Sequence, residues 1–341
     1  MISEMPIGSP AWASFACSHP SATLFHQPVW AQLLEECYGH RAFALVLSDR
    51  SGQIAAGMPM VEMRSRLTGR RWVSLPFTDH CAPLASSEGA LADLVGWLVE
   101  KQAAGEIPSV EVRWALPIKQ GVRARQPYVI HTLQLRADPQ SQLMAFERTT
   151  RQKIKQAEKQ GVHLVSFGDR RDVECFYRLQ VLTRRNLGVP VQPRRFFLRL
   201  WEQLIRPGQG HLVLAAEGDD VVAGALSLYH GRAAMIKYVA YDPRRKALPI
   251  VRFAVWKAVE WACQQGFPAL DFGRTDASQE GLREFKHHFR PIEEPLTYSW
   301  IGGDRWQPTN TWADRALRTL IKRSPATVCR GMGELLYAHF G

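Results

Sequence analysis

Leu270-Asp271-Phe272-Gly273-Arg274-Thr275, followed downstream by Phe285-Lys286, is the stretch that best indicates how this chain folds and acts. Its apolar start predicts a buried strand that ends at Asp271 and continues into a polar turn. Glycine in that turn lets the backbone approach a ligand closely. Arg274 and Lys286 can donate hydrogen bonds to a phosphate or to a developing oxyanion. With Asp271 they predict a charged, anion-binding site at the carboxyl end of a strand; the alternative is an ordinary loop with a surface ion pair.

The composition is that of a folded protein with anionic partners. The chain has 341 residues, of which 46% are hydrophobic, so it can form two ordinary domains or one large one around a sizeable core. Its eleven tryptophans and fifteen phenylalanines argue against disorder. The formal net charge of +11 favours phosphorylated cofactors, nucleic acid or an acidic membrane surface as partners, without choosing among them.

Cysteine and histidine usage gives no sign of a metal centre. The six cysteines are scattered, with no C-x-x-C pair, as is typical of small buried residues in a reducing compartment. We interpret His287-His288 as structural or surface residues, because adjacent residues rarely ligate one metal, and we predict no metal site. The start of the chain lacks the features of a signal peptide, and no apolar run reaches the length of a membrane-spanning helix. We therefore expect a soluble cytoplasmic protein.

The two halves of the chain repeat one pattern. Strands are predicted at residues 43–47 and 54–63, joined by a turn with acid and glycine, then a helix at 90–103 and a strand at 110–114. The same order returns with strands at 212–216 and 221–229, a helix at 249–265 and the strand that leads to Asp271. We interpret this as a duplicated mixed α/β unit with a cleft between the copies; the alternative is generic α/β alternation.

A long basic helix is predicted between the halves. Asp138 as N-cap and Pro139 at the first helical position begin it, and it runs to Gln160 before Gly161. Its cations indicate either a solvated face or a linker helix between two domains.

The end of the chain predicts two short amphipathic helices, at residues 311–322 and 326–339, separated at Ser324-Pro325. These helices either pack on the second domain or rest on an anionic membrane surface. The predicted organisation is a first domain at residues 1–138, the basic linker helix at 139–161, a second, catalytic domain at 162–303 and a helical tail at 304–341.

Four sequence blocks follow one another in a recognisable order. They are the loop at residues 74–80, the basic helix at 151–162, the run from Phe176 through Pro190 to Phe197, and Leu270 to Arg274 with Phe285-Lys286. In this order they resemble the blocks of FemAB-like proteins, most closely the branch associated with exosortase and exopolysaccharide systems. The resemblance covers roughly residues 25 to 340.

The resemblance implies a fold and a reaction. It implies two tandem GNAT-like acyltransferase domains and transfer of an acyl or aminoacyl group to an amine, with acyl-CoA or aminoacyl-tRNA as the donor. The family's CoA-binding turn, Q/R-x-x-G-x-G/A, is replaced here by residues 242–249, which lack glycine. Phosphate binding is still expected there, because cations precede a helix N-terminus. The candidate cofactor-binding residues are Arg244, Arg245, Lys246 and, on a strand that would face the donor, Tyr238.

The resemblance also suggests roles for single residues. Lys286 matches the family lysine and is expected to stabilise the reaction electrostatically, while Arg274 would hold a phosphate or carboxylate. Asp271, Asp276 or Glu280 could take the proton of the amine, and proton loss assisted by the substrate is an equal alternative. The candidate substrate-binding residues are Tyr177, Arg185 and Asp79, and structural packing is the alternative for Tyr177, Arg185 and Tyr238.

Three hypotheses for function follow. The first is a cytoplasmic N-acyltransferase that uses acyl-CoA on an amine of a cell-envelope or exopolysaccharide precursor, with peripheral contact to the inner face of the membrane through the tail. The second uses aminoacyl-tRNA, in keeping with the positive charge. The third is a non-catalytic polyanion-binding protein; no helix-turn-helix, zinc finger or RNA-binding signature supports it, and no DNA partner is expected.

Overall fold

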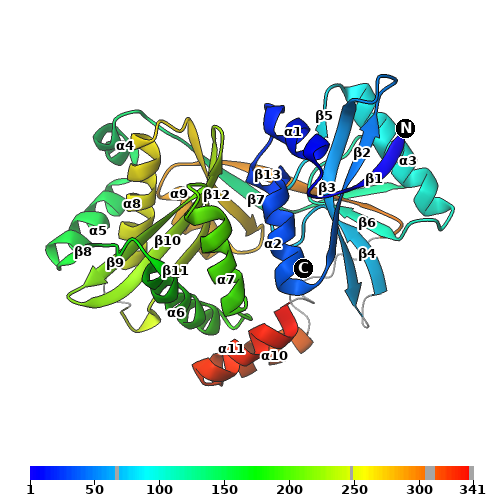
Figure 1. Ribbon diagram of the computed structural model, residues 1–341. Helices are drawn as coiled ribbons and strands as arrows, with labels where there is room; N and C mark the ends of the chain where they lie inside the picture. The colour runs from blue at the N-terminus through cyan, green and yellow to red at the C-terminus, as the bar shows by residue number, and fades with distance from the viewer. Residues whose placement is uncertain (66–68, 246–248, 304–311, 338–341) are drawn as a thin grey trace.

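The computed structural model describes residues 1–65, 69–245, 249–303 and 312–337. They form a mixed α/β molecule in which helices cover a sheet that runs through both halves (Figure 1).

Both halves of the sheet are built from the same unit. In the first half, three antiparallel strands lead through a helix to a strand parallel to the third: β2 Arg41–Ser48, β3 Ile54–Ser65, β4 Gly69–Val73, α3 Glu88–Ala103 and β6 Ser109–Val112. The second half repeats this order with β9 Gly210–Glu217, β10 Asp220–His230, β11 Ala233–Tyr241, α8 Ile250–Gln264 and β12 Ala269–Asp276. A crossover helix is the usual connection between parallel neighbours. The predicted duplication is confirmed.

Further elements flank each unit. The first half adds β1 Ile2–Pro6, α1 Pro10–Ser18, η1 Leu24–His26, α2 Pro28–Tyr38 and β5 Leu84–Ala85. The second adds α4 Pro139–Ala145, α5 Arg148–Lys159, β8 Val162–Val165, α6 Arg170–Leu187, α7 Arg194–Leu200, η2 Trp201–Ile205, η3 Pro243–Arg245 and α9 Glu280–His287. The sequence pattern does not predict β1, α1 or α9, which are short.

The final strand of each unit crosses to the other unit. β7 Val122–Gln134 follows β6 but pairs with β12, whereas β13 Ile292–Ile301 follows β12 but pairs with β6 and β7. The strand order is therefore β1-β2-β3-β4-β6-β13-β7-β12-β11-β10-β9-β8, with β5 beside β3. The sequence does not predict β13, because Pro295 interrupts it and a proline inside a run argues against a central strand.

The halves also share an apolar core. Trp30 of α2 meets Phe196 of α7 edge to face, with ring centroids 6.1 Å apart, in a buried cluster drawn from both halves. Since this contact and the exchanged strands both cross between the units, the residues at their junction are held in fixed positions.

The basic helix between the halves differs from its prediction. Asp138 does cap its start, accepting from the backbone N–H groups of Gln140 and Ser141. The helix then breaks at Phe146, so that α4 and α5 are separate. The Phe146 ring is buried against Trp256 and Phe289. The helix is interrupted at Phe146, the residue whose ring enters the core. α5 itself packs on α8 of the second half.

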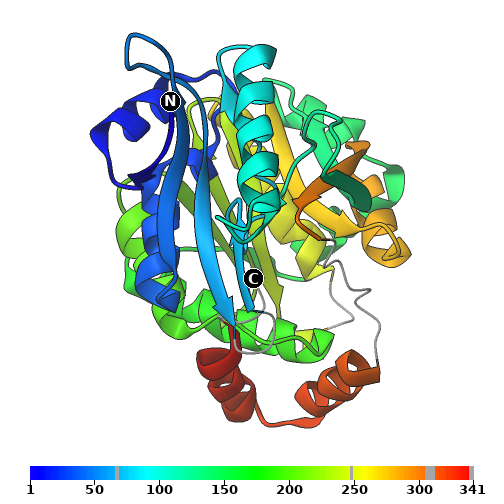
Figure 2. The same ribbon diagram turned by 90° about the vertical axis from the view of Figure 1, so that its right-hand side faces the viewer.

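The tail forms the two predicted helices, α10 Trp312–Arg323 and α11 Ala326–Leu336, with the break at Ser324-Pro325. Both helices contact α6, and Figure 2 shows them together at one end of the molecule. The side chains of Ile321 and Cys329 are buried. Of the two interpretations, packing on the second half is therefore the one observed. Among the described residues, no helix is long and apolar enough to cross a membrane.

A pair of buried serines tests how β13 is tied to the first half. The Ser299 hydroxyl of β13 donates to the carbonyl of Trp114 (2.9 Å) and accepts from the N–H of Leu116 (3.0 Å). Ser299→Ala leaves both groups without their partner, so we expect the free energy of unfolding in urea to fall by about 1–3 kcal/mol. Ser227→Ala in β10 is the matched control, because that buried hydroxyl has no hydrogen-bond partner among the described residues, and its loss should be neutral or stabilising. Equal effects of the two changes would contradict this account.

Candidate active site

A bulge in β12 shapes the centre of the second half. β11 and β12 pair only at Ala234 with Leu270 and Met235 with Asp271. The register of β12 against β7 shifts between Asp271 and Arg274, and Gly273 lies in the left-handed region with φ of 71°. The strand therefore does not end at Asp271, as the sequence suggested; it continues through the bulge to Asp276. A Cβ on Gly273 would lie 3.1 Å from the Asp79 carboxylate, so glycine is needed for space as well as for φ.

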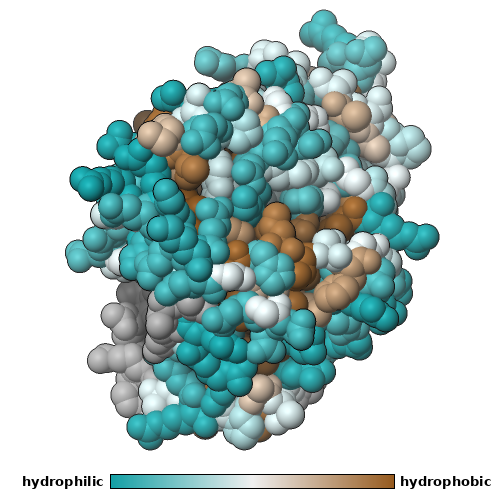
Figure 3. Space-filling view, turned by 90° about the vertical axis from the view of Figure 1, so that its left-hand side faces the viewer, coloured by the Kyte–Doolittle hydropathy of each residue, from teal (hydrophilic) through white to brown (hydrophobic). Residues whose placement is uncertain are grey.

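A cavity of about 1000 Å³ opens where β11 and β12 separate, bounded also by α6, α8 and α9. Its lining is mainly apolar, with Leu187, Val189, Ile236, Val239, Val255, Phe272, Leu282 and Phe285. Figure 3 shows apolar side chains gathered in a hollow on the face formed by the second half. Cationic side chains also line the cavity, namely Lys153, Arg184, Arg245, Arg252 and Arg318. An apolar cavity with a few cations suits a ligand that has an apolar portion and an anionic one.

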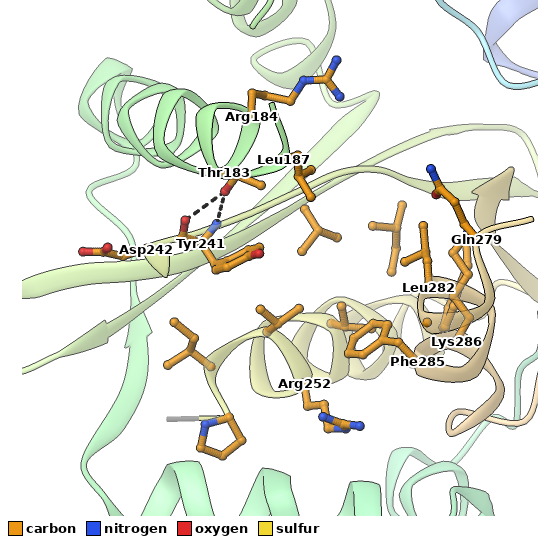
Figure 4. Close-up of a pocket in the computed structure, with 18 of the residues that line it drawn as sticks. Thr183, Arg184, Leu187, Tyr241, Asp242, Arg252, Gln279, Leu282, Phe285 and Lys286 are labelled. Carbon is orange, nitrogen blue, oxygen red and sulfur yellow. Dashed lines mark hydrogen bonds between the residues drawn. The ribbon is translucent and has the colours of Figure 1, made fainter. Parts of the chain in front are cut away.

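Lys286 lies in the cavity wall, next to Leu282 and Phe285 of the same helix (Figure 4). Its side chain is buried, and Nζ donates to the carbonyl of Gly273 at 2.6 Å. Burial lowers the pKa of this ammonium group to about 8, against the opposing charges of Asp79, Asp271 and Glu293. No carboxylate oxygen of the described side chains lies within ion-pair distance of Nζ. A buried ammonium in a cavity wall without a carboxylate partner makes Lys286 a candidate functional residue.

Arg274 and Asp79 lie together at the junction of the two halves. The Asp79 carboxylate is 3.3 Å from Nζ of Lys237 and 3.9 Å from Nε of Arg274. Although burial opposes ionisation, these two cations lower the pKa of Asp79. The Arg274 guanidinium lies over the ring of Tyr128 and donates to the hydroxyl of Tyr298. Arg274 thus lies beside the cavity, in contact with Tyr128, Tyr298 and Asp79, and does not line it.

Asp271 holds the bulge in place. One carboxylate oxygen accepts from the N–H of Gly273 at 2.7 Å, and the other lies 2.9 Å from Nε2 of His80. Despite burial, the pKa of His80 is raised by Asp271. Both oxygens are occupied, so the geometry suits a positioning role better than a base. Asp276 caps its own turn by accepting from Ser278, and neither it nor Glu280 lines the cavity.

Three of the four candidate cofactor-binding residues are the cations that follow Asp242. Arg244 is paired with Asp242, and Arg245, which lines the cavity, is paired with Glu217 and Asp220. Lys246 lies outside the described residues.

Tyr238 requires a correction. It does not face the cavity but packs against Phe196 and Phe197 on the other side of β11. The register of β11 against β10 shifts at Lys237, which leaves Ile236 and Val239 on the cavity side. A bulge of this kind cannot be seen in strand alternation.

The candidate substrate-binding residues do not converge on one place. Tyr177 is buried against Phe197, and its ring is covered by Arg330 of the tail, 5.7 Å from the centroid. Arg185 is also on α6, and neither residue lines the cavity. Asp79 lies at the junction of the halves, as described above. The contacts of Tyr177 are those of a packing residue, which is the alternative that the sequence left open.

Three other residues at the site were not predicted to belong to it. His80 stands in the first of the four blocks, and Lys237 is next to Tyr238, but nothing distinguished either one. Tyr298 lies in β13, the strand that was not predicted.

A histidine pair lies behind Lys286. His131, His287 and Glu293 bring potential ligand atoms within 4.8 Å of one another. The Glu293 carboxylate is already held by a guanidinium fork from Arg283, with contacts of 2.7 and 3.1 Å. Nε2 of His287 lies 3.1 Å from the same carboxylate.

Comparisons with known proteins agree with this geometry. Residues 145–287 match the model of the acetyltransferase (GNAT) domain family. No curated protein sequence matches the chain. The crystal structure of FemX is similar, at 15% identity over 94% of this chain and 100% of that chain, with a TM-score of 0.65.

Two further structures have the same architecture. The C-terminal domain of an Agrobacterium fabrum protein assigned as a lysylphosphatidylglycerol synthetase is 16% identical over 95% of this chain and 96% of that chain, with a TM-score of 0.55. A tandem GNAT protein from the clavulanic acid biosynthesis pathway is 10% identical over 89% of this chain and 99% of that chain, with a TM-score of 0.54. At such identities the likeness is one of fold. The chain thus has the predicted tandem GNAT-like fold, and residues 145–287 match a GNAT acetyltransferase domain.

The buried state of Lys286 predicts a pH dependence of stability. Between pH about 8 and the ordinary lysine value of 10.5, the unfolded side chain holds a proton that the folded one has lost. The contribution of Lys286 to the free energy of unfolding should therefore rise with pH across this window. This contribution is absent from Lys286→Met, so the free energy of unfolding of wild type minus that of the variant, measured by urea unfolding at several pH values, should increase across the window. Lys159→Met, at an exposed position of α5, should keep the wild-type profile. Parallel profiles for wild type and Lys286→Met would show that Lys286 is not desolvated.

Proposed function

We propose that the chain is an N-acyltransferase that moves an acyl group from acyl-CoA to an amine of a cell-envelope or exopolysaccharide precursor. The observation that carries the proposal is the buried ammonium of Lys286, without a carboxylate partner among the described side chains, in the wall of the apolar cavity between β11 and β12. We further propose that the reaction takes place in the cytoplasm, at the inner face of the membrane.

In the proposed reaction the amine nitrogen attacks the thioester carbonyl carbon. A tetrahedral oxyanion forms, the carbon–sulfur bond breaks, the amine nitrogen gives up a proton, and the CoA thiolate leaves and is protonated. The apolar cavity would hold the pantetheine and acyl portions and exclude water. Lys286, charged at neutral pH, would stabilise the oxyanion, where a preorganised donor is most effective. Asp271 and His80 would act indirectly by fixing the bulge whose Gly273 carbonyl orients Lys286.

The variant Lys286→Ala tests this role. We expect kcat to fall by about 10²–10³-fold, with a much smaller change in KM, because the interaction is made mainly in the transition state. Release of CoA thiol would be followed with a set of acyl-CoAs and amino-sugar acceptors. Lys159→Ala is the control for a general loss of positive charge. A kcat of Lys286→Ala equal to that of wild type would remove Lys286 from the mechanism.

An aminoacyl-tRNA donor is the second candidate. It is favoured by the net charge of +11 and by the fold shared with FemX. Treating the donor mixture with ribonuclease separates the two enzymes, since only the tRNA-dependent activity would be lost. The third candidate, a polyanion-binding protein, predicts no turnover with either donor and the same binding of a polyanion by wild type and Lys286→Ala.

A further inference from the structure

The C-terminal tail lies against the wall of the proposed donor cavity. We infer that α10 completes the donor site and that Arg318 binds the diphosphate of the CoA donor. This inference rests on the proposed function, because it assigns a ligand to the same cavity. The family match ends at residue 287, so the tail lies outside the matched domain.

Two close backbone approaches dock the tail on the segment that joins α6 to α7. Gly188 ends α6 with φ of 74°, and a Cβ there would lie 2.8 Å from the carbonyl oxygen of Arg318. At the other end, a Cβ on Gly333 of α11 would lie 2.1 Å from the carbonyl oxygen of Val191. Side chains at these two positions would push the helices away. The tail is thus fitted to this segment, and the fit places Arg318 beside Gly188.

The docked position brings Arg318 into the cavity wall. Leu187 and Val189, on either side of Gly188, line the cavity together with Arg318. Arg318 is half-buried, whereas Arg323 on the same helix is exposed. The cavity wall on the α6 side is therefore made by two segments far apart in the sequence, and the tail contributes the cation Arg318 to it.

Two other cations that line the cavity, Arg245 and Arg184, are less available to an anion than Arg318. Arg245 is held between Glu217 and Asp220, and Arg184 donates from Nε to the carbonyl of Pro190. In Figure 4 the Arg184 side chain also projects away from the centre of the cavity. Guanidinium groups bind phosphate oxygens through paired hydrogen bonds, so Arg318 is suited to a diphosphate. Binding of the diphosphate by Arg318 would compensate for the absence of glycines from residues 242–249, the turn expected to bind CoA phosphates.

The test compares Arg318→Ala with Arg323→Ala, using the full chain and two donors. With acyl-CoA, Arg318→Ala should raise the KM for the donor about tenfold and leave kcat nearly unchanged, as expected for loss of a charge-assisted hydrogen bond. With acyl-pantetheine, which lacks the diphosphate, the KM of Arg318→Ala should equal that of wild type. Arg323→Ala should behave like wild type with both donors.

Gly188→Ala provides a second variant that keeps the arginine but disturbs its docking. It should raise the KM for acyl-CoA as Arg318→Ala does, and it should speed alkylation of the buried Cys329, followed by peptide mass spectrometry. A KM for acyl-CoA unchanged in Arg318→Ala, with turnover intact, would overturn the inference and leave the proposed function standing.

Calorimetric titration with CoA separates the remaining cases. Binding by wild type that is weakened in Arg318→Ala, without turnover of any acyl-CoA, would support the tail site and reject the proposed reaction. An absence of both binding and turnover in wild type would reject both.

Discussion

The left-handed backbone at Gly273 is the constraint on which the site depends. It produces the bulge that separates β12 from β11, and the cavity opens where the two strands part. Its carbonyl receives the Lys286 ammonium, and its N–H is held by Asp271. Its missing side chain leaves room for the Asp79 carboxylate from the other half of the molecule. One residue thus sets the cavity, the orientation of the lysine and the fit between the halves.

The exchange of β7 and β13 explains why the two halves are needed together. β7, from the first half, supplies the partner against which β12 bulges, and β13, from the second, supplies Tyr298 to Arg274. Asp79 and His80 then reach the bulge from the first half. A single copy of the unit would lack these contacts, so the first half serves to support the site in the second. Such a shared junction supplies partners to the buried charged side chains. Leaving a buried charge without its partner would cost free energy of folding.

The sequence predicts the repeated unit well, because each helix and strand has a clear local pattern with turns or caps such as Asp138. It also indicates Lys286, first as a cation that follows the polar turn after Asp271 and then through the resemblance. Prediction from the sequence fails where a single residue interrupts the local helix or strand pattern. Pro295 lies inside β13, so this strand is not predicted. The bulge at Lys237 turns Tyr238 away from the cavity. The predicted helix is interrupted at Phe146, whose ring packs in the core. Each of these depends on contacts distant in the sequence, which no local window contains.

Two buried lysines show how function can be distinguished from structure here. Lys237 has the Asp79 carboxylate at 3.3 Å and three aromatic rings within 5.8 Å, so its charge is compensated where it lies. Lys286 is also buried, yet it donates only to the backbone carbonyls of Gly273 and Arg274. Carbonyl dipoles orient an ammonium group without neutralising it. The positive charge at Lys286 therefore remains available to the cavity, and an anion that forms there meets a donor already in place. Burying this charge without a carboxylate partner lowers the stability of the fold. That loss of stability is the strongest physical reason to place the proposed chemistry at Lys286 rather than at Lys237.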